Sequence, residues 1–404
     1  MSEILFLAHR APWPPDRGDR IRSWHLLNHL SDLAPVHVAA FADTDADAAA
    51  AFPVIDRMVE GCWIDVRPQS RATVLAKTLP RLRPLSLGLF DSARMRGHVA
   101  HVLATRPISH IVAFSSQMAQ FVPRDFAGQF VMDFVDVDSA KFTEYANSDK
   151  RLSPLWFAHR YEGWRLAAWE RAVAARANHS LFVSDAEAQL FRDRAGSVAH
   201  NVHEIENGID AAHFSPDVRL EHPIAPGSLA VFTGQMDYRP NVEAVRWFAD
   251  MVLPGIREVK PDFRFAIVGR NPTDVVQALA KRPGVIVTGE VADTRPWLAA
   301  ASVVVAPLKV ARGVQNKLLE AMAMGRAVVA SSAAARGIDA EVGSDLIVAD
   351  EPNVVARSIL DLVEHPNRAV AMGQAARARM VARYSWQATL APLDELMGLE
   401  SAAG

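Results

Sequence analysis

The sequence predicts an α/β protein with two doubly wound domains in tandem. The chain has 404 residues, whereas a single hydrophobic core stops growing at about 250–300 residues. Short, continuous apolar runs alternate with segments of helical apolar spacing, which is typical of parallel sheets covered by helices on both faces. The alternation breaks at Glu206-Asn207-Gly208-Ile209-Asp210, where an Asn-Gly turn precedes a proline-rich stretch. We therefore expect domains at 1–207 and 208–384, and a final helix at 385–404 that packs back on the first domain.

The first domain begins with a strand at 4–8, a loop that contains three prolines, and a helix entered near Ile21. Apolar residues at Ile21, Trp24, Leu27 and Leu30 keep the spacing of a helix face. Further strands are expected at 36–41, 63–66, 108–114, 130–135 and 180–183, and further helices at 95–105, 139–147 and 155–177.

The second domain repeats the pattern, with strands expected at 229–233, 263–268, 285–288, 303–306 and 327–330. Four of these five strands meet Gly or Pro near their carboxyl ends, the edge at which open parallel sheets bind ligands. The tail at 352–399 is expected to form two or three helices.

Composition excludes several classes of function. The chain carries 43 Lys and Arg against 46 Asp and Glu, and the resulting net charge of −3 lacks the basic excess that a nucleic-acid partner requires. The single cysteine, Cys62, excludes a disulfide framework and a metal site built from several thiolates. No secretory segment is visible, and the longest uncharged run, at 296–308, is shorter than the about 20 residues of a membrane span. We therefore expect a cytoplasmic protein.

Residues 312–330 are the most informative stretch, because they follow a predicted strand and begin a helix. A helix N-terminus beside Gly313 offers free backbone N–H groups to an anion. Asn316, Lys317 and Glu320 share one face of this helix. The N–H groups and Lys317 suit a diphosphate, and the Glu320 carboxylate suits ribose hydroxyls. The stretch thus indicates a nucleoside-diphosphate site; an ordinary surface pair on an amphipathic helix is the alternative interpretation.

The same stretch resembles the donor-binding signature of the family 4 retaining glycosyltransferases. That signature is Glu-x7-Glu followed by Ala-Met-Ala-x-Gly-x-Pro-Val-Val, and residues 320–323, Gly325 and 328–329 match it. The resemblance implies that Glu320 binds the ribose, although Arg312 replaces the first glutamate and Ala327 the proline. It also implies the GT-B fold, in which two Rossmann-like domains face each other across a cleft. A hexosyltransferase of this kind uses a nucleotide-diphosphate sugar as co-substrate, with no cofactor and no metal.

Other segments extend the resemblance over nearly the whole chain. Residues 206–210 are similar to the start of the family's second domain, and 232–241 to its Gly-rich strand–loop. This likeness implies that Gly234 and Arg239 face the donor diphosphate, although Arg239 could also be a simple helix-entry residue. Residues 10–22 and 133–141 are similar to glycosyltransferases associated with bacterial exosortase (PEP-CTERM) and exopolysaccharide loci.

The loop after the first strand supplies the remaining candidates. In relatives this loop approaches the donor phosphates and the acceptor, which makes Gly18 and Arg20 candidate contacts. Asp19, the nearest carboxylate, is a candidate catalytic residue, and it would equally suit a helix cap. In the retaining family the leaving phosphate can deprotonate the acceptor, so no other base is assigned.

A metal-dependent alternative rests on Asp136-x-Asp138, the pattern with which the other glycosyltransferase fold binds Mg²⁺ or Mn²⁺. A similar pattern recurs at Asp43, Asp45 and Asp47, in a segment that we expect to be a loop. Because tandem domains favour the metal-independent fold, Asp133, Asp136 and Asp138 are instead expected to cap loops or contact the acceptor.

Membrane contact is expected at a basic, apolar patch at 71–96, which suits an anionic cytoplasmic leaflet. The helix at 155–177 also combines tryptophans with arginines, but we favour a buried helix with a polar back there. The expected partners are a nucleotide-sugar donor, a lipid-linked or glycan acceptor, and the inner membrane through peripheral contact. Two rival functions remain: a nucleotide-sugar epimerase of similar architecture, and a non-catalytic protein that binds nucleotide sugars.

Overall fold

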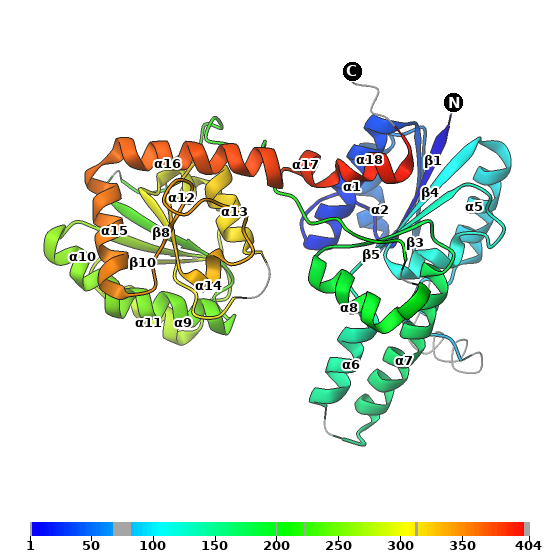
Figure 1. The fold of residues 1–404 in the computed structure, drawn as a ribbon, viewed down its shortest axis with the longest axis horizontal. Coiled ribbons are helices and arrows are strands. Elements are labelled where there is room, and N and C mark those ends of the chain that lie inside the picture. Colours follow the sequence, from blue (N-terminus) through cyan, green and yellow to red (C-terminus); the bar gives the residue numbers. More distant parts are fainter. Residues whose placement is uncertain are drawn as a thin grey trace. The chain divides into compact units, whose positions relative to one another are not determined.

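The computed structural model describes residues 2–67, 82–149, 151–198, 200–221, 223–225, 227–311 and 314–399. The chain folds into two compact units (Figure 1). The first contains the residues up to Asn207 together with those from Thr389 onward, and the second spans Gly208–Ala388. Each unit is built around a parallel sheet flanked by helices, so the predicted α/β class with two doubly wound domains is confirmed.

The first unit holds, within the described residues, a seven-stranded sheet in the order β3-β2-β1-β4-β5-β6-β7, and every strand pair is parallel. The strands are β1 (Glu3–Ala8), β2 (Val36–Ala42), β3 (Gly61–Val66), β4 (Ile108–Phe114), β5 (Gln129–Val135), β6 (His179–Phe182) and β7 (Val202–Glu204). All residues of β1 are buried, which explains its continuous apolar sequence. The sequence analysis missed β7, because its three residues include a single apolar side chain.

The helices of the first unit are α1 (Gly18–Leu33), α2 (Asp45–Ile55), α4 (Leu85–Leu89), α5 (Ala93–Thr105), α6 (Asp138–Ser148), α7 (Pro154–Ala174) and α8 (Asp185–Ala195). The expected loop at Asp43, Asp45 and Asp47 is wrong, since Asp45 and Asp47 lie in the first turn of α2 and the Thr44 side chain caps it. A run of alanines hides the apolar periodicity of this helix. The same analysis missed α8, which Ser184 caps in the same way.

The second unit holds a six-stranded parallel sheet, in the part of the chain described, in the order β10-β9-β8-β11-β12-β13. The strands are β8 (Leu229–Thr233), β9 (Arg264–Val268), β10 (Val285–Gly289), β11 (Val303–Ala306), β12 (Val328–Ala330) and β13 (Ile347–Val348). The two-residue β13 was not predicted, because it is too short to carry a period.

The helices of this unit are α9 (Arg239–Trp247), α10 (Leu253–Val259), α11 (Asp274–Ala278), α12 (Arg295–Ala300), α13 (Asn316–Ala323), α14 (Ser332–Ala335), α15 (Pro352–Glu364) and α16 (Pro366–Arg379). Helix α17 (Trp386–Leu390) leads into α18 (Pro392–Met397), so the tail contains more helices than the two or three expected. Helix α18 belongs to the first unit, where Asp394 lies 2.6 Å from the ring of His29. Among the described residues, no helix combines the length and apolar character that a membrane crossing requires.

Strand order reverses once in each sheet, between β1 and β4 and between β8 and β11. Parallel α/β sheets bind ligands beyond the carboxyl ends of the strands at such switch points. Each unit therefore offers one edge at which a functional site is expected.

Candidate functional site: two sheet edges

A pocket of about 620 Å³ lies at the carboxyl edge of the second sheet. The turns after β8, β9 and β10 and the first turn of α13 surround it. Its lining residues are Thr233, Gly234, Gln235, Tyr238, Asn241, Val268, Gly269, Arg270, Glu290, Val291, Thr294, Val314, Gln315, Asn316, Lys317 and Glu320.

Two glycines keep this pocket open. Gly234 and Gly269 follow β8 and β9 directly and adopt φ angles of +155° and +149°. A Cβ at Gly269 would lie 1.7 Å from the Gly234 carbonyl oxygen, and one at Gly234 would lie 3.1 Å from Lys317 Nζ. Only glycine permits this backbone conformation together with this close approach.

Lys317 is held in a fixed position inside the pocket. Its ammonium donates a hydrogen bond to Asn241 Oδ1 at 2.6 Å and lies 4.2 Å from the centre of the Phe232 ring. Asn241 is itself buried and donates to the Gln235 carbonyl. Burial lowers the pKa of Lys317 to about 8, while Glu320 opposes the shift. The ammonium is thus charged at neutral pH, and its hydrogen-bond partner among the described residues is a neutral amide, which leaves its charge available to an anion.

Glu320 lines the same pocket one turn further along α13. Burial raises the pKa of this half-buried carboxyl to about 7, and the Lys317 charge limits the rise. Asn316 is exposed at the first position of the helix and completes the shared face that the sequence predicted. A carboxyl with a raised pKa in a pocket is a frequent mark of a functional site.

Two further features of the pocket suit an anionic ligand with hydroxyl or phosphate oxygens. The N-cap residue Gln315 makes no side-chain cap hydrogen bond to α13, and the first residues of the helix line the pocket, so the positive end of the helix dipole lies at the pocket. The Thr233 hydroxyl at the end of β8 is buried and has no hydrogen-bond partner among the described residues. A buried hydroxyl of this kind costs free energy until a ligand or a water satisfies it.

One predicted donor-binding residue, Arg239, is not brought into this group. Arg239 does not line the pocket: its side chain is 89% exposed and pairs with Glu243 at 2.7 Å, one turn along α9. Gly313 and Arg312 lie outside the described residues. Arg270 takes the place that the sequence analysis gave to Arg239, because it follows Gly269 at the end of β9 and lines the pocket.

The corresponding edge of the first sheet carries a smaller, charged pocket of about 340 Å³. Asp19 lines it and lies 2.7 Å from Arg10 Nη1 and 3.3 Å from His9 Nε2. Burial would raise the pKa of Asp19, but the hydrogen bonds from His9 and Arg10 outweigh it and hold this pKa far below its usual range. Burial also lowers the pKa of His9. Asp19 is therefore a paired carboxylate at neutral pH.

Gly18 and Arg20 take different positions from Asp19. Gly18 begins α1, and a Cβ added there would meet no described atom within 4 Å. Arg20 is buried and pairs with Asp16 at 3.3 Å and with Asp47 at 3.8 Å, so it does not line the first pocket. The contact of Gly18 and Arg20 with the donor phosphates or the acceptor stays a prediction.

The three aspartates of the metal-dependent alternative are engaged by cations. Asp133 is buried and accepts from Arg22 Nε at 2.9 Å. Lys141 lies 2.6 Å from Asp136 and 3.6 Å from Asp138. In the part of the chain that the structure describes, no group of three or more His, Cys, Asp or Glu side chains is placed to hold a metal ion.

Backbone strain marks the first edge. Ser115 and Val135 follow β4 and end β5, line the pocket, and have φ angles of +74° and +71°. A β-branched residue in the left-handed region is a genuine outlier, and such strain is concentrated at functional sites. The sequence carries no signal for it, because neither position holds glycine or asparagine.

Residues 227–365 match the family model described as Glycosyl transferases group 1, a range that contains the whole pocket of the second unit. Over the full length the chain is similar to Anabaena HepE solved in complex with UDP, with 17% identity, a TM-score of 0.60, and 98% of this chain and 100% of that chain covered. It is also similar to sucrose-phosphate synthase from Thermosynechococcus elongatus, with 17% identity, a TM-score of 0.58 and 98% of each chain covered. The protein is a glycosyltransferase of the GT-B fold.

A glycosyltransferase from Rickettsia africae shares the fold at 11% identity, with a TM-score of 0.61 and 98% and 97% of the two chains covered. No curated protein sequence matches this glycosyltransferase. At these identities the neighbours establish its fold, and the residues of its site rest on the geometry above.

Proposed function

We propose that the protein transfers a sugar from a nucleoside-diphosphate sugar to a hydroxyl of a lipid-linked or polysaccharide acceptor, with retention of configuration. We also propose that it acts at the cytoplasmic face of the membrane, in exopolysaccharide or glycolipid synthesis. Its family would be the family 4 enzymes, in the exosortase-associated subgroup. The observation that carries the donor proposal is the pocket in which Lys317, Glu320 and the uncapped start of α13 lie together. The complexes of HepE with UDP and with UDP-glucose support a nucleotide sugar as the donor.

In this proposal Glu320 binds the ribose. An ionised carboxylate accepts hydrogen bonds from two neighbouring hydroxyls, and a half-buried position strengthens those bonds. The diphosphate lies between Lys317, Arg270 and the first N–H groups of α13, with Asn316 and Gly234 beside it. The unsatisfied Thr233 hydroxyl donates to a diphosphate oxygen at the floor of the pocket.

The proposed transfer reaction develops negative charge on the leaving diphosphate. The bond between the anomeric carbon and the diphosphate oxygen breaks, and the acceptor oxygen bonds to the same face of that carbon. The leaving phosphate accepts the hydroxyl proton, so no side chain acts as base. Lys317, Arg270 and the helix dipole stabilise the charge on the leaving diphosphate, the term that is usually largest in such reactions. These cations take the role of a metal ion, so we propose that the reaction needs no metal cofactor.

Variants of α13 test the donor site against a matched control. We expect Glu320→Gln and Lys317→Met each to weaken nucleoside-diphosphate affinity and to lower nucleotide release by about 10²-fold, since each removes a charged hydrogen-bond partner. Arg239→Ala should change neither by more than about twofold, because this side chain is exposed and pairs with Glu243. Thermal shift with UDP and UDP-glucose measures binding, and a coupled assay measures release.

Undiminished binding in both α13 variants would contradict the donor site. Incubation of the donor alone separates transfer from epimerisation, because an epimerase would convert the sugar without releasing the nucleotide. A chelator should leave nucleotide release unchanged.

A further inference from the structure

Helices α6 and α7 form a hairpin that extends away from the first unit's sheet (Figure 1). The C-terminal half of α7 is buried through Leu166, Glu170 and Val173. Its N-terminal half buries Glu162 and Gly163 but exposes large apolar side chains, as does the preceding turn: Leu152 and Leu155 are 67% and 62% exposed, and Phe157 and Trp164 are also exposed. The buried helix that the sequence analysis favoured is therefore wrong for this half of α7.

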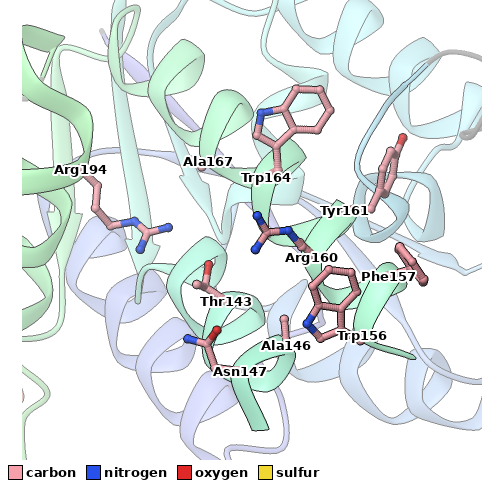
Figure 2. Close-up of a pocket in the computed structure, with 11 residues that line it drawn as sticks. Thr143, Ala146, Asn147, Trp156, Phe157, Arg160, Tyr161, Trp164, Ala167 and Arg194 are labelled. Carbon is pink, nitrogen blue, oxygen red and sulfur yellow. The ribbon is translucent and has the colours of Figure 1, made fainter. Parts of the chain in front are cut away.

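A pocket of about 570 Å³ lies between α6, α7 and α8 on the same hairpin (Figure 2). Trp156, Phe157, Tyr161 and Trp164 supply its aromatic wall, and Arg160 and Arg194 supply its cations. No acidic residue lines it within the described part of the chain.

The two acids of α7 bind backbone N–H groups outside this pocket, and Glu144 of α6 does not line it, so the described charged residues of its lining are Arg160 and Arg194. Glu162 accepts from the backbone N–H groups of Leu85 and Ser86, and Glu170 accepts from that of Ser139. The guanidinium of Arg160 lies 5.4 Å from the Trp156 ring centre, and that of Arg165 lies 5.0 Å from the Trp164 ring centre. These arginines are thus held beside aromatic rings rather than in ion pairs with the acids of their own helix.

The basic patch expected at 71–96 differs from this surface. Residues 71–81 lie outside the described residues. In the described remainder Leu87 and Phe90 are buried, Arg96 pairs with Asp91, and Arg94 pairs with Asp65. Leu82 is exposed there, but Arg83, Arg94 and Arg96 are all in ion pairs, whereas Arg160 and Arg194 of the hairpin pocket form none with a described residue.

We propose that the exposed surface of the α6–α7 hairpin docks onto a bilayer that contains anionic lipids. Leu152, Leu155 and Phe157 enter the acyl boundary, the tryptophans lie at the headgroup level, and the arginines bind lipid phosphates. Aliphatic side chains combined with Trp and Arg are the composition of interfacial membrane-binding elements. Anionic lipids match the charge, and guanidinium groups bind phosphate with two parallel hydrogen bonds.

Two other occupants fit the surface less well. A soluble glycan would use the aromatic rings but not Leu152 and Leu155, and it would favour carboxylate acceptors that this pocket lacks among its described lining. A second copy of the chain in a two-fold contact would bring Arg160 and Arg194 of both pockets together, and no acid in the described lining of either pocket would pair with them. The bilayer alone uses the aliphatic, aromatic and cationic side chains together.

Vesicle binding by the purified full-length chain tests the proposal. We expect co-sedimentation with phosphatidylcholine vesicles that contain phosphatidylglycerol, and little with phosphatidylcholine alone. Leu155→Asp combined with Phe157→Asp should weaken the partition by about tenfold or more, because two inserted apolar side chains are lost. Val259→Asp is the matched control, since Val259 is also 62% exposed but lies on α10 of the second unit. Arg160→Gln should weaken the binding by about fivefold.

Three results would overturn the proposal: no binding to anionic vesicles, equal binding to neutral vesicles, or wild-type binding by the double variant at an unchanged unfolding temperature. Light scattering adds a fourth, a dimer that the double variant converts into a monomer. The experiment contains neither donor nor acceptor, so it can fail while the donor-site test succeeds.

Discussion

The carboxyl edges of the two sheets have the same strand arrangement but differ in how their charged side chains are paired. At the first edge the charges are already neutralised, since Asp19 pairs with Arg10 and Lys141 pairs with Asp136. At the second edge Lys317 donates to the neutral Asn241 and lies beside an aromatic ring, with Glu320 in the same pocket, and the Thr233 hydroxyl has no described partner. The second edge thus holds a cation that has no ion pair among the described residues, whereas the cations of the first edge are paired with carboxylates. Unsatisfied buried atoms do not separate the two edges, because His9 Nδ1, Arg10 Nε and Arg67 Nε at the first edge also lack hydrogen-bond partners among the described residues.

The two edges also differ in the backbone strain of their turns. The second edge turns through glycines at positive φ, which the chain adopts without strain, whereas the first edge turns through Ser115 and Val135 at positive φ. A ligand can therefore approach the backbone closely at the second edge. The first edge instead holds its side chains in a costly conformation that the surrounding fold must enforce. Replacing glycine by alanine at the second edge should therefore destabilise the chain, whereas replacing Val135 by glycine at the first edge should stabilise it.

Gly269→Ala should have the largest effect. The new Cβ would lie 1.7 Å from the Gly234 carbonyl oxygen, so the turns after β8 and β9 must separate. We expect the free energy of unfolding to fall by about 3 kcal/mol or more, with loss of nucleoside-diphosphate binding. Denaturant unfolding and thermal shift with UDP measure the two effects.

Gly343→Ala is the control for this prediction. Gly343 also has a positive φ, of +93°, but a Cβ there would meet nothing within 4 Å. Its cost should be the conformational term alone, about 1–2 kcal/mol, with binding retained. If both alanines cost the same, the close approach of the two turns contributes nothing.

The pH dependence of donor binding should come from the second edge and change affinity by about tenfold for each pH unit outside its optimum. Glu320 accepts ribose hydroxyls only when ionised, and burial raises its pKa to about 7. Lys317 binds phosphate only when protonated, and burial lowers its pKa to about 8. UDP affinity should therefore be greatest between these values, and should fall as pH decreases below 7 or increases above 8. Calorimetric titration across this range measures it.

Single variants assign the two limbs of this profile. Glu320→Gln should remove the acid limb and Lys317→Met the alkaline limb. Asp19 should contribute to neither, because its hydrogen bonds outweigh burial and keep its pKa far below neutrality. An acid limb that persists in Glu320→Gln would place the titrating group elsewhere.

Sequence patterns predicted the central strands of both sheets because these strands are buried on both faces. The expected bounds 108–114, 229–233 and 303–306 agree with β4, β8 and β11. Helix α2 and strand β13 were missed for opposite reasons, since the alanines of α2 hide its period and β13 is too short to have one. The local sequence pattern predicts an element where burial is continuous along it. The pattern fails where the element is short, as in β13, or uniform in composition, as in α2.

The candidate site was predicted where helix spacing alone determines it. Asn316, Lys317 and Glu320 share a face of α13 by virtue of their spacing, and all three line the pocket. The choice between Arg239 and Arg270 needed the tertiary structure, because both follow a strand of the same sheet. The Glu243 side chain one turn after Arg239 was the available signal that this cation is engaged elsewhere. The exposure of Trp164 could not be predicted, because it depends on which other elements pack against α7, and the local sequence pattern does not indicate them.

The smallest effect is expected at the first edge, where glycine should stabilise the chain. Val135 has a φ of +71°, a conformation that costs a β-branched residue about 1–3 kcal/mol. Val135→Gly removes that cost, and against it stand the lost packing of a half-buried side chain and the greater freedom of the unfolded chain, which together are smaller. We therefore expect the free energy of unfolding to rise by about 1 kcal/mol, as measured by denaturant unfolding.

Val287→Gly provides the comparison, because Val287 is a half-buried valine within β10 and has no positive φ. Glycine there relieves no strain, so it should lower the free energy of unfolding by about 1 kcal/mol through lost packing and greater freedom of the unfolded chain. A loss of stability in both variants would mean that the backbone at Val135 is not strained. The contrast between a strained and an unstrained edge would then not hold, and the two edges would differ in charge pairing alone.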